Sequence, residues 1–253
     1  MTVQGAPPPI SAVIIARDAE ATIGATLESL QYFAEVVVYD NGSEDRTLEI
    51  AEPFPNVRVY EGEFIGFGPT KNRAADLAEH DWVFSIDSDE QISPELLESI
   101  SGCDLGDPVT AYEVQRVNYL RGKAVRHSGW GGDWLLRLYN RRGTSVSDAA
   151  VHEVVQAPPG GRVVRLKGEL SHDAVRELGQ FLVKIDRYSE LFRKDSPRLL
   201  PVPVIFLRSV WTFIRVYVFQ FGFLDGWRGL VIAVGDANGV FFKYMKAFAD
   251  AND

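Results

Sequence analysis

The chain has 253 residues, of which 46% are hydrophobic and 24% charged, a composition typical of one large folded domain with room for an appendage. Residues 1–161 carry 12 Lys and Arg against 25 Asp and Glu, whereas residues 162–253 carry 14 against 10, for a formal net charge of −9. The acidic body excludes nucleic acid as an expected partner, because such binding depends on neutralising phosphates. A mildly basic, apolar tail favours an anionic membrane surface, although a random scatter of charge is an alternative.

Two features indicate the compartment. The single cysteine, Cys103, cannot form an internal disulfide, so nothing points to an oxidising environment. Residues 1–9 lack the basic start and long apolar stretch of a signal peptide. We therefore expect a cytoplasmic protein.

Strands and helices alternate over the first hundred residues. Apolar runs rich in β-branched residues predict buried strands, and helical spacing between them predicts helices. The strands are expected at 10–16, 35–39, 57–60 and 82–86, and the helices at 19–33, 46–52 and 69–80. This alternation predicts an α/β fold with a mostly parallel central sheet and flanking helices on both faces.

Beyond residue 107 the pattern changes to short, Gly-rich, strand-like pieces at 110–117, 134–139 and 162–166, before helical periodicity returns at 174–194. No linker divides these pieces from the first half, so we expect both halves to share one sheet. We predict a single domain over residues 1–184, with halves at 1–100 and 101–184, and a helical C-terminal extension over 185–253.

The sharpest local motif is Asp87-Ser88-Asp89, directly after the apolar strand WVFSI. Ligands of parallel α/β sheets gather at the carboxyl ends of strands, where these acids lie. Two carboxylates in one loop can hold a hard divalent cation, which in turn binds a diphosphate. The motif alone is weak, because similar residues start helices, as Ser93-Pro94-Glu95 just downstream does.

The first two predicted strands also end in acidic residues. Asp40 begins the turn Asp40-Asn41-Gly42-Ser43, and Arg17-Asp18 follows the first strand. A carboxylate at Asp40 can accept a hydrogen bond from the N3–H of a uracil ring; a simple Asx turn is the structural alternative. Three of the four predicted strands therefore end in these acids at one edge, which favours a ligand site.

In their order, the segments VIIARD, VVVYDNGSEDRT, GPTKNRA and WVFSIDSDE resemble the family 2 glycosyltransferases with a GT-A fold. Farther along, SGWGGDWLLRLYNRRG, AVHEVV, LSHD and GFLDGWRGL are similar to the subgroup that builds the lipopolysaccharide inner core by adding glucose to heptose. The resemblance spans about residues 10–250. It implies that the 1–100 half binds a nucleotide sugar and the 101–184 half binds the acceptor.

Matched position by position, the resemblance implies a nucleotide-sugar site for a UDP-linked donor. Its members would be Ala16, Asp18, Asp40, Lys71, Asn72, Asp87 and Ser88. Asp40 would contact the uracil, and Lys71 and Asn72 would lie near the diphosphate or the sugar, unless they are an ordinary exposed helix turn. Family members commonly have Asn-Glu where this chain has Arg17-Asp18, a departure in the uracil-ribose contacts.

The resemblance also implies a divalent cation, Mn²⁺ or Mg²⁺, held by Asp89 with Asp87 and His172. An inverting transfer needs a base that removes the proton of the acceptor hydroxyl. Glu153 matches the family position of that base, and Asp133 is the second candidate. Gly129 and Trp130 match a loop that closes over the acceptor, where an aromatic ring can stack on a sugar.

Residues 201–224 are apolar enough to suggest a transmembrane helix, but Arg208 and Arg215 argue against one. Seven residues apart, they form a cationic stripe on an apolar helix, as in helices that lie in a membrane interface. A second apolar helix at 229–248 contains Lys243 and Lys246. The alternative is a helical pair packed on the catalytic core or on another subunit.

Together these features predict an inverting glycosyltransferase that moves a sugar, glucose by the resemblance, from a UDP-sugar to a lipopolysaccharide-core or other lipid-linked glycan at the inner face of the cell membrane. Transfer to a polyprenyl phosphate or a peptide, and a nucleotide-sugar-binding protein without turnover, are the alternatives. An oligomer is possible. A nicotinamide dehydrogenase is excluded, because ARDAEATIGA lacks the glycine spacing that lets a helix meet a pyrophosphate.

Overall fold

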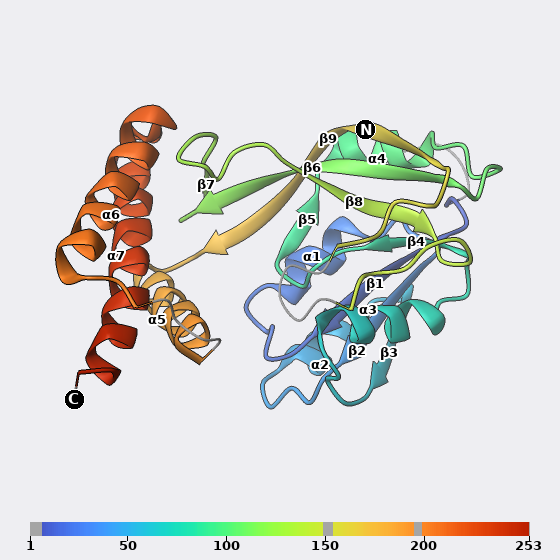
Figure 1. Ribbon diagram of the computed structural model, residues 1–253. Helices are drawn as coiled ribbons and strands as arrows, with labels where there is room; N and C mark the ends of the chain where they lie inside the picture. Colours follow the sequence, from blue (N-terminus) through green and yellow to red (C-terminus); the bar gives the residue numbers. More distant parts are fainter. Residues whose placement is uncertain (1–6, 149–153, 195–198, 253) are drawn as a thin grey trace. The chain divides into compact units, whose positions relative to one another are not determined.

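The computed structural model describes residues 7–148, 154–194 and 199–252 (Figure 1). The chain forms two compact units: unit 1 comprises residues 1–116 and 133–172, and unit 2 comprises residues 117–132 and 173–253. Strands β6 and β9 run from one unit into the other. The domain boundary at residue 184 remains a prediction.

The first half of unit 1 is an alternating α/β arrangement. Strands β1, β2, β3 and β4 form the parallel order β3-β2-β1-β4, with helices α1, α2, α3 and α4 between or after them. The strands are Ile10–Ala16, Glu35–Asp40, Val57–Glu61 and Trp82–Ser85, and the helices are Ile23–Ser29, Thr47–Ala51, Phe67–Asp76 and Pro94–Ser101. Ser93 caps α4 by accepting a hydrogen bond from the N–H of Leu96 at 3.2 Å, as its sequence indicates.

The later strands extend the same sheet in the order β4-β8-β6-β9-β5, with β7 beside β6. The β4–β8, β8–β6, β6–β7 and β9–β5 pairs are antiparallel. They are β5 (Glu90–Ile92), β6 (Thr110–Leu120), β7 (Lys123–Ala124), β8 (Asp133–Asn140) and β9 (Arg162–Val175). The expected α/β fold with both halves on one sheet is confirmed. The sheet as a whole is mixed, parallel in its first four strands, and it includes β5, which the sequence did not predict.

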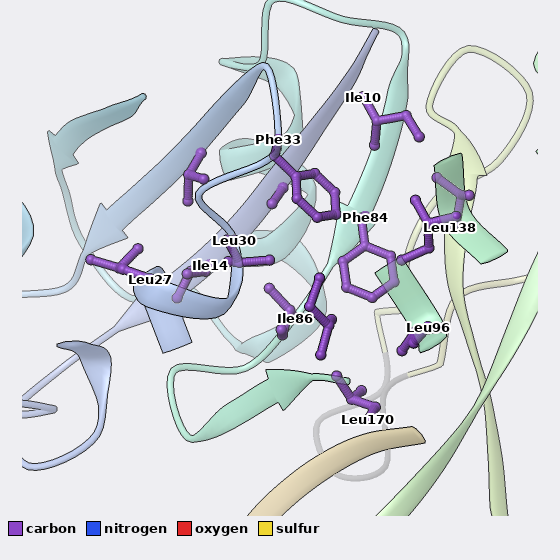
Figure 2. Packing of buried hydrophobic residues seen from close by; sticks show 14 of the residues in the cluster. Ile10, Ile14, Leu27, Leu30, Phe33, Phe84, Ile86, Leu96, Leu138 and Leu170 are labelled. Carbon is purple, nitrogen blue, oxygen red and sulfur yellow. The ribbon is translucent and has the colours of Figure 1, made fainter. Parts of the chain in front are cut away.

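Alternation along β1 explains why the sheet is buried on both faces. Ile10, Ala12 and Ile14 point to the face covered by α1, α2 and α4, whereas Val13 points to the face covered by α3. Figure 2 shows the first cluster, in which Phe33 and Phe84 lie with ring centroids 5.7 Å apart. Burial on both faces requires the continuous apolar runs seen in the sequence.

Unit 2 is mainly helical. Helices α5 (Leu178–Lys194) and α6 (Val202–Ile214) precede a π-helical turn (Arg215–Phe219) and a 3₁₀ turn (Gly222–Asp225), and α7 (Trp227–Asp250) closes the chain. Helix α7 packs closely on α5, because a Cβ at Gly235 would lie 2.3 Å from the ring of Phe181. Helix α6 packs on α7 by a narrow stripe that includes Ile205 and Thr212.

Outside that stripe, α6 leaves an apolar surface exposed. Residues Val202–Phe219 form a helical run of 18 residues with mean hydropathy 1.5, long and apolar enough to cross a membrane, and only 17% of it is buried. Leu207 is 64% exposed and Phe219 61%. This C-terminal segment therefore has the composition and exposure of a helix that can associate with a membrane.

Candidate functional site

The candidate site lies at the carboxyl edge of the parallel strands. Ala16, the last residue of β1, is paired with Asp40, the last residue of β2, and β4 runs parallel on the other side of β1. The residues that follow these strands, Asp18 and Asp87 among them, therefore meet at one edge of the sheet, as the sequence predicted. Such an edge is where open α/β sheets bind ligands.

A hydroxyl connects the first two acids of this edge. The N–H of Asp18 donates to Ser43 Oγ at 3.0 Å, and that hydroxyl donates to Asp40 Oδ1 at 2.5 Å. Asp40 Oδ2 also accepts from the N–H groups of Gly42 and Ser43, both at 2.9 Å. The Asx-turn interpretation of Asp40 is thus confirmed, and the carboxylate, only 1% exposed, keeps one acceptor position on Oδ1 for a ligand.

The loops after β1 and β2 are joined by further hydrogen bonds. The N–H of Ala19 donates to Thr47 Oγ1 at 2.7 Å, and the N–H of Glu20 donates to Asp45 Oδ2 at 2.9 Å. Asp18 Oδ1 accepts from the N–H of Glu44 at 2.9 Å, and Asp18 itself has a left-handed backbone with φ of 50°. A non-glycine residue is strained there, and such strain persists only where surrounding contacts enforce it. These contacts also explain why α1 begins at Ile23 rather than at residue 19.

The turn after β4 presents the second group of acids. The N–H of Glu90 donates to the carbonyl of Asp87 at 3.0 Å, which closes a four-residue turn around Ser88 and Asp89. The hydroxyl of Thr26 on α1 donates to the carbonyl of Ser88 at 2.9 Å. The turn is therefore tied to a buried helix and holds its acids in a defined place.

A buried charge cluster surrounds Asp87. Lys71 Nζ lies 2.8 Å from Asp87 Oδ1, and Arg137 Nη2 lies 3.0 Å from Asp87 Oδ2. Arg137 Nη2 also donates to Glu90 Oε1 at 2.7 Å and Oε2 at 2.9 Å. Glu90 is fully buried and Arg137 is 6% exposed, so these groups depend on one another for their charge.

The pKa values within the cluster follow from this arrangement. Burial alone would raise the pKa of Asp87, but attraction by Arg137 and Lys71 outweighs it and holds the pKa well below its usual range. Burial raises the pKa of Glu90, against the attraction of Arg137. Asp87 is therefore an anion at neutral pH whose negative charge is already balanced by two cations.

Asp89 takes a different place in the same turn. Its Oδ2 lies 3.4 Å from His172 Nε2, and its side chain is 40% exposed. His172 is paired with Glu90 between β9 and β5, which fixes it beside the turn. Among the described residues no group of three or more His, Cys, Asp or Glu side chains is arranged to hold a metal. The structure thus brings Asp89 and His172 together, whereas Asp87 is engaged by Lys71 and Arg137.

The side-chain amide of Asn72 binds the backbone of Val146. Its amide donates to the carbonyl of Val146 at 2.9 Å and accepts from the N–H of Val146 at 2.8 Å. On the same helix, a Cβ at Gly68 would lie 1.9 Å from the carbonyl oxygen of Ser147, so only glycine permits this close approach. Ser147 in turn donates its N–H to the carbonyl of Val154 at 2.9 Å. Helix α3 therefore holds Val146 and Ser147, and Ser147 in turn binds Val154 on the other side of the segment 149–153.

The two candidate bases differ in what the structure describes. Glu153 lies outside the described residues. Asp133 begins β8, is 43% exposed, and its Oδ2 lies 3.0 Å from Arg116 Nη2. Asp133 is therefore an ion-paired carboxylate in unit 1.

The loop that contains Gly129 and Trp130 belongs to unit 2, where Asp225 holds it. Asp225, 7% exposed, accepts from the N–H groups of Arg126 and His127 at 3.2 and 3.0 Å and from Ser128 Oγ at 3.1 Å. Trp130 packs edge-to-face on Phe181 with centroids 5.8 Å apart. These contacts connect two segments that lie about 100 residues apart in the sequence, RHSGW and GFLDGW.

Sequence reasoning missed Arg137, Glu90 and Ser43. Arg137 stands between Leu136 and Leu138, and a charged residue inside an apolar strand is a signal of a buried partner. The register of β8 against β6 skips Arg137, so the residue sits at a β-bulge, a device that redirects a side chain. The bulge itself has no signature in the sequence.

Comparison with known proteins identifies the family. The family described as Glycosyl transferase family 2 matches residues 11–163, more than half of the chain and almost all of unit 1. The chain belongs to glycosyl transferase family 2. The carboxyl-edge acids of this glycosyltransferase, Asp18, Asp40, Asp87 and Asp89, all lie within the matched residues.

Individual relatives extend the match beyond unit 1. The lipopolysaccharide core biosynthesis glycosyltransferase LpsC of Rhizobium meliloti is 27% identical, over 97% of this chain and 97% of its own length. An uncharacterized glycosyltransferase of Rickettsia typhi is 26% identical, over 94% of this chain and 86% of its own length. A solved structure, GalNAc-T7 with UDP, GalNAc and Mn²⁺, is 13% identical with a TM-score of 0.44 and covers 64% of this chain and 42% of that one.

Proposed function

We propose that this glycosyltransferase moves a sugar, glucose by the resemblance of its motifs, from a UDP-sugar to a lipopolysaccharide-core or similar lipid-linked glycan, with inversion. The observation that carries the proposal is the acidic carboxyl edge, where Asp89 faces His172 beside an Asp87 fixed by two cations. The relative LpsC, named for lipopolysaccharide core biosynthesis, supports the acceptor class because the two chains correspond over nearly their full lengths.

The donor site is proposed along this edge. Asp40 offers its remaining acceptor position to the uracil N3–H, and Ala16 and Asp18 form the wall beside it. Lys71 orients the Asp87 carboxylate toward a ribose or sugar hydroxyl. Asn72 holds the segment near Val146 through its hydrogen bond to the backbone. Ser88 keeps the turn in place through its carbonyl.

A divalent cation fits the residues present. Mn²⁺ and Mg²⁺ bind through one or two carboxylates completed by substrate phosphates, and imidazole is also a ligand of Mn²⁺. Asp89 and His172 are such a pair, with side chains 40% and 15% exposed, whereas Asp87 has its charge satisfied. When bound, the cation would neutralise the charge of the departing diphosphate. Asp89 and His172 would hold it, and Asp87 would remain a contact to the sugar.

We assign the deprotonation of the acceptor hydroxyl to Glu153, with Asp133 as the second candidate. Asp133 Oδ2 is engaged by Arg116 Nη2 at 3.0 Å, so this carboxylate already has a protein partner. Ser147 and Val154, on either side of the segment 149–153 that contains Glu153, are joined by a hydrogen bond of 2.9 Å. General-base catalysis of this kind contributes about 10²–10⁴ in rate.

Unit 2 is proposed to make peripheral contact with the inner face of the cell membrane, where a lipid-linked acceptor resides. The support is the exposed apolar surface of α6, far larger than the scattered apolar residues of an ordinary protein surface. Transfer to a polyprenyl phosphate or a peptide remains the alternative acceptor chemistry.

The test is release of UDP from a panel of nucleotide sugars with Mn²⁺ or Mg²⁺, with and without purified glycolipid acceptors. We expect UDP release that depends on one nucleotide sugar and increases with a lipopolysaccharide-core acceptor. Turnover only with polyprenyl phosphate or peptide would replace the acceptor class. Tight UDP-sugar binding without turnover on any acceptor would mean a binding protein.

A further inference from the structure

A cavity of about 260 Å³ lies between α6 and α7 in unit 2 and contains basic side chains from both helices. Arg208 and Arg215 come from the α6 segment and Lys243 from α7, with Trp211, Thr212 and Tyr244 also lining the walls. Seven residues separate the two arginines, so two helical turns bring them to the same face. The cavity is smaller than a typical drug-sized pocket and suits a single headgroup.

The three basic groups of this cavity differ from the nearby Lys246 in their acidic surroundings. Among the described residues, no carboxylate oxygen lies within 4 Å of Arg208, Arg215 or Lys243. By contrast, Lys246 on the same helix lies 2.6 Å from Asp186 Oδ1 and 2.7 Å from a Glu190 oxygen. Three like charges gathered in one cavity repel one another, and an anionic ligand would relieve that repulsion.

Asp236 is the acidic side chain that acts on this cluster. Burial raises the pKa of Asp236 to about 6, although Arg215 lowers it. Asp236 therefore interacts with Arg215, and with three basic side chains lining it the cavity retains net positive charge at neutral pH. The π-helical turn begins at Arg215, and such turns frequently occur at functional sites.

Aromatic rings hold the basic groups at the rim. The guanidinium of Arg208 lies 5.8 Å from the ring centroid of Tyr244, and Lys243 Nζ lies 4.2 Å from that of Phe192. Cation–π contacts orient the charges without neutralising them. Trp and Tyr beside basic residues are also the side chains enriched where proteins meet the headgroup layer of a membrane.

The surroundings of the cavity indicate where its ligand comes from. Trp211, in its wall, is 56% exposed, and the neighbouring Leu207 and Phe219 on the same segment are more than half exposed. A cavity for a soluble anion needs no such apolar border, whereas a lipid headgroup arrives with acyl chains beside it. Positive charge inside an apolar border is complementary to an anionic bilayer.

We propose that the cavity formed by Arg208, Arg215 and Lys243 binds the phosphate group of an anionic membrane phospholipid. This inference deepens the membrane contact proposed above and rests on it. It assigns that contact a defined headgroup site instead of a general attraction between a basic tail and a negative surface.

The test measures co-sedimentation of the full chain with vesicles of phosphatidylcholine alone, and with added phosphatidic acid or added oleic acid at matched surface charge. We expect the wild type to prefer phosphatidic acid over oleic acid. The double variant Arg208→Gln with Arg215→Gln should lose that preference, with a loss of affinity on the order of 30-fold for two basic residues. Lys243→Gln should weaken it on its own.

The matched control is Lys184→Gln with Arg187→Gln, which removes the same charge from two exposed positions of α5. If both double variants lose equal affinity, or if oleic acid serves as well as phosphatidic acid, the attraction is general and the headgroup site is wrong. Binding of inorganic phosphate at the cavity, measured by calorimetry, with no preference among vesicles would assign a soluble anion instead.

Parallel measurements separate this inference from the proposed function. Each variant is checked by circular dichroism and by UDP release with a soluble acceptor, neither of which should change, because Arg208, Arg215 and Lys243 lie in unit 2 and the donor residues in unit 1. Wild-type protein that ignores every vesicle and elutes as a stable oligomer would overturn both the headgroup site and the membrane contact, while glycosyl transfer would stand.

Discussion

Replacement of Arg137 by Met tests the buried charge cluster directly. Arg137 is 6% exposed and is the closest cation to the fully buried Glu90, while it shares Asp87 with Lys71. Removing one partner of a buried ion pair costs about 3–5 kcal/mol, because the remaining charge is left without compensation. Arg116 Nη1 lies 3.8 Å from Glu90 Oε1 and would still partly compensate the charge of Glu90. We therefore expect a loss of about 3 kcal/mol in the free energy of unfolding.

The loss should depend on pH, and the sign follows from Glu90. In the wild type burial already raises the pKa of Glu90, and removal of Arg137 takes away the main attraction that opposes burial. The folded variant then binds a proton that the unfolded chain releases above its ordinary pKa, so stability falls as pH rises through the interval between the two values. Arg137→Met should therefore be closer to the wild type at pH 5 than at pH 8.

The assay is urea denaturation at both pH values, with hydrogen exchange of β4 and β8 amides to assign the transition to unit 1. Adding Glu90→Gln to Arg137→Met should restore most of the stability at pH 8, because no buried charge is left unpaired. Arg142→Met is the matched control: its side chain is 69% exposed, and its ion pair with Asp81 is worth about 0–1 kcal/mol. A loss for Arg137→Met no larger than for Arg142→Met, or one unaffected by pH, would refute the reasoning.

Three further changes test the site and the helical unit. Asp89→Ala should abolish transfer and EDTA should silence the wild type reversibly, as measured by UDP release; full activity in EDTA would remove the metal from the mechanism. Glu153→Gln should keep donor affinity but lower the transfer rate by about 10²–10⁴, whereas near-normal rates together with an inactive Asp133→Asn would exchange the two roles. Asp236 has a folded pKa of about 6 against an ordinary 3.8, so its contribution falls as pH rises through that interval. Asp236→Asn should stabilise the protein by about 2 kcal/mol at pH 8 and hardly at pH 4, in thermal unfolding; equal effects at both pH values would contradict the assignment.

The parallel half of the fold could be predicted because its strands are buried on both faces and therefore appear as continuous apolar runs. Strand β5 could not, since it has three residues, begins with a glutamate and depends on pairing with the distant β9. The end of β9 was missed for a related reason: the strand-like piece was expected at 162–166, but β9 runs to Val175 and contains His172. The local sequence pattern does not indicate pairing between strands that are far apart in the chain.

The candidate site divides in the same way. Positions at strand ends, such as Asp18, Asp40 and Asp87, could be predicted because parallel strands place their carboxyl ends at one edge. The different surroundings of Asp87 and Asp89 could not be predicted. They depend on Lys71 and on a bulge at Arg137, which arises from the pairing of β8 with β6. Two carboxylates in one short motif therefore have different surroundings, one neutralised by protein cations and one facing His172.

Because Asp87 and Asp89 have different surroundings, one part of the site can exchange a ligand while the other part keeps its geometry. Asp87 is held by Lys71 and Arg137 whether or not a donor is present, so its orientation requires no ligand charge. Among the described residues, His172 is the ion-pair partner of Asp89, and the Asp89 side chain is 40% exposed, so it is open to the divalent cation proposed above. For the proposed transfer from a UDP-sugar, a fixed anion beside an exposed metal ligand would let UDP leave after each transfer, because only the weaker of the two contacts would have to break. The hydrogen-bonded chain from Asp18 through Ser43 to Asp40 extends the rigid part to the nucleotide end of the edge.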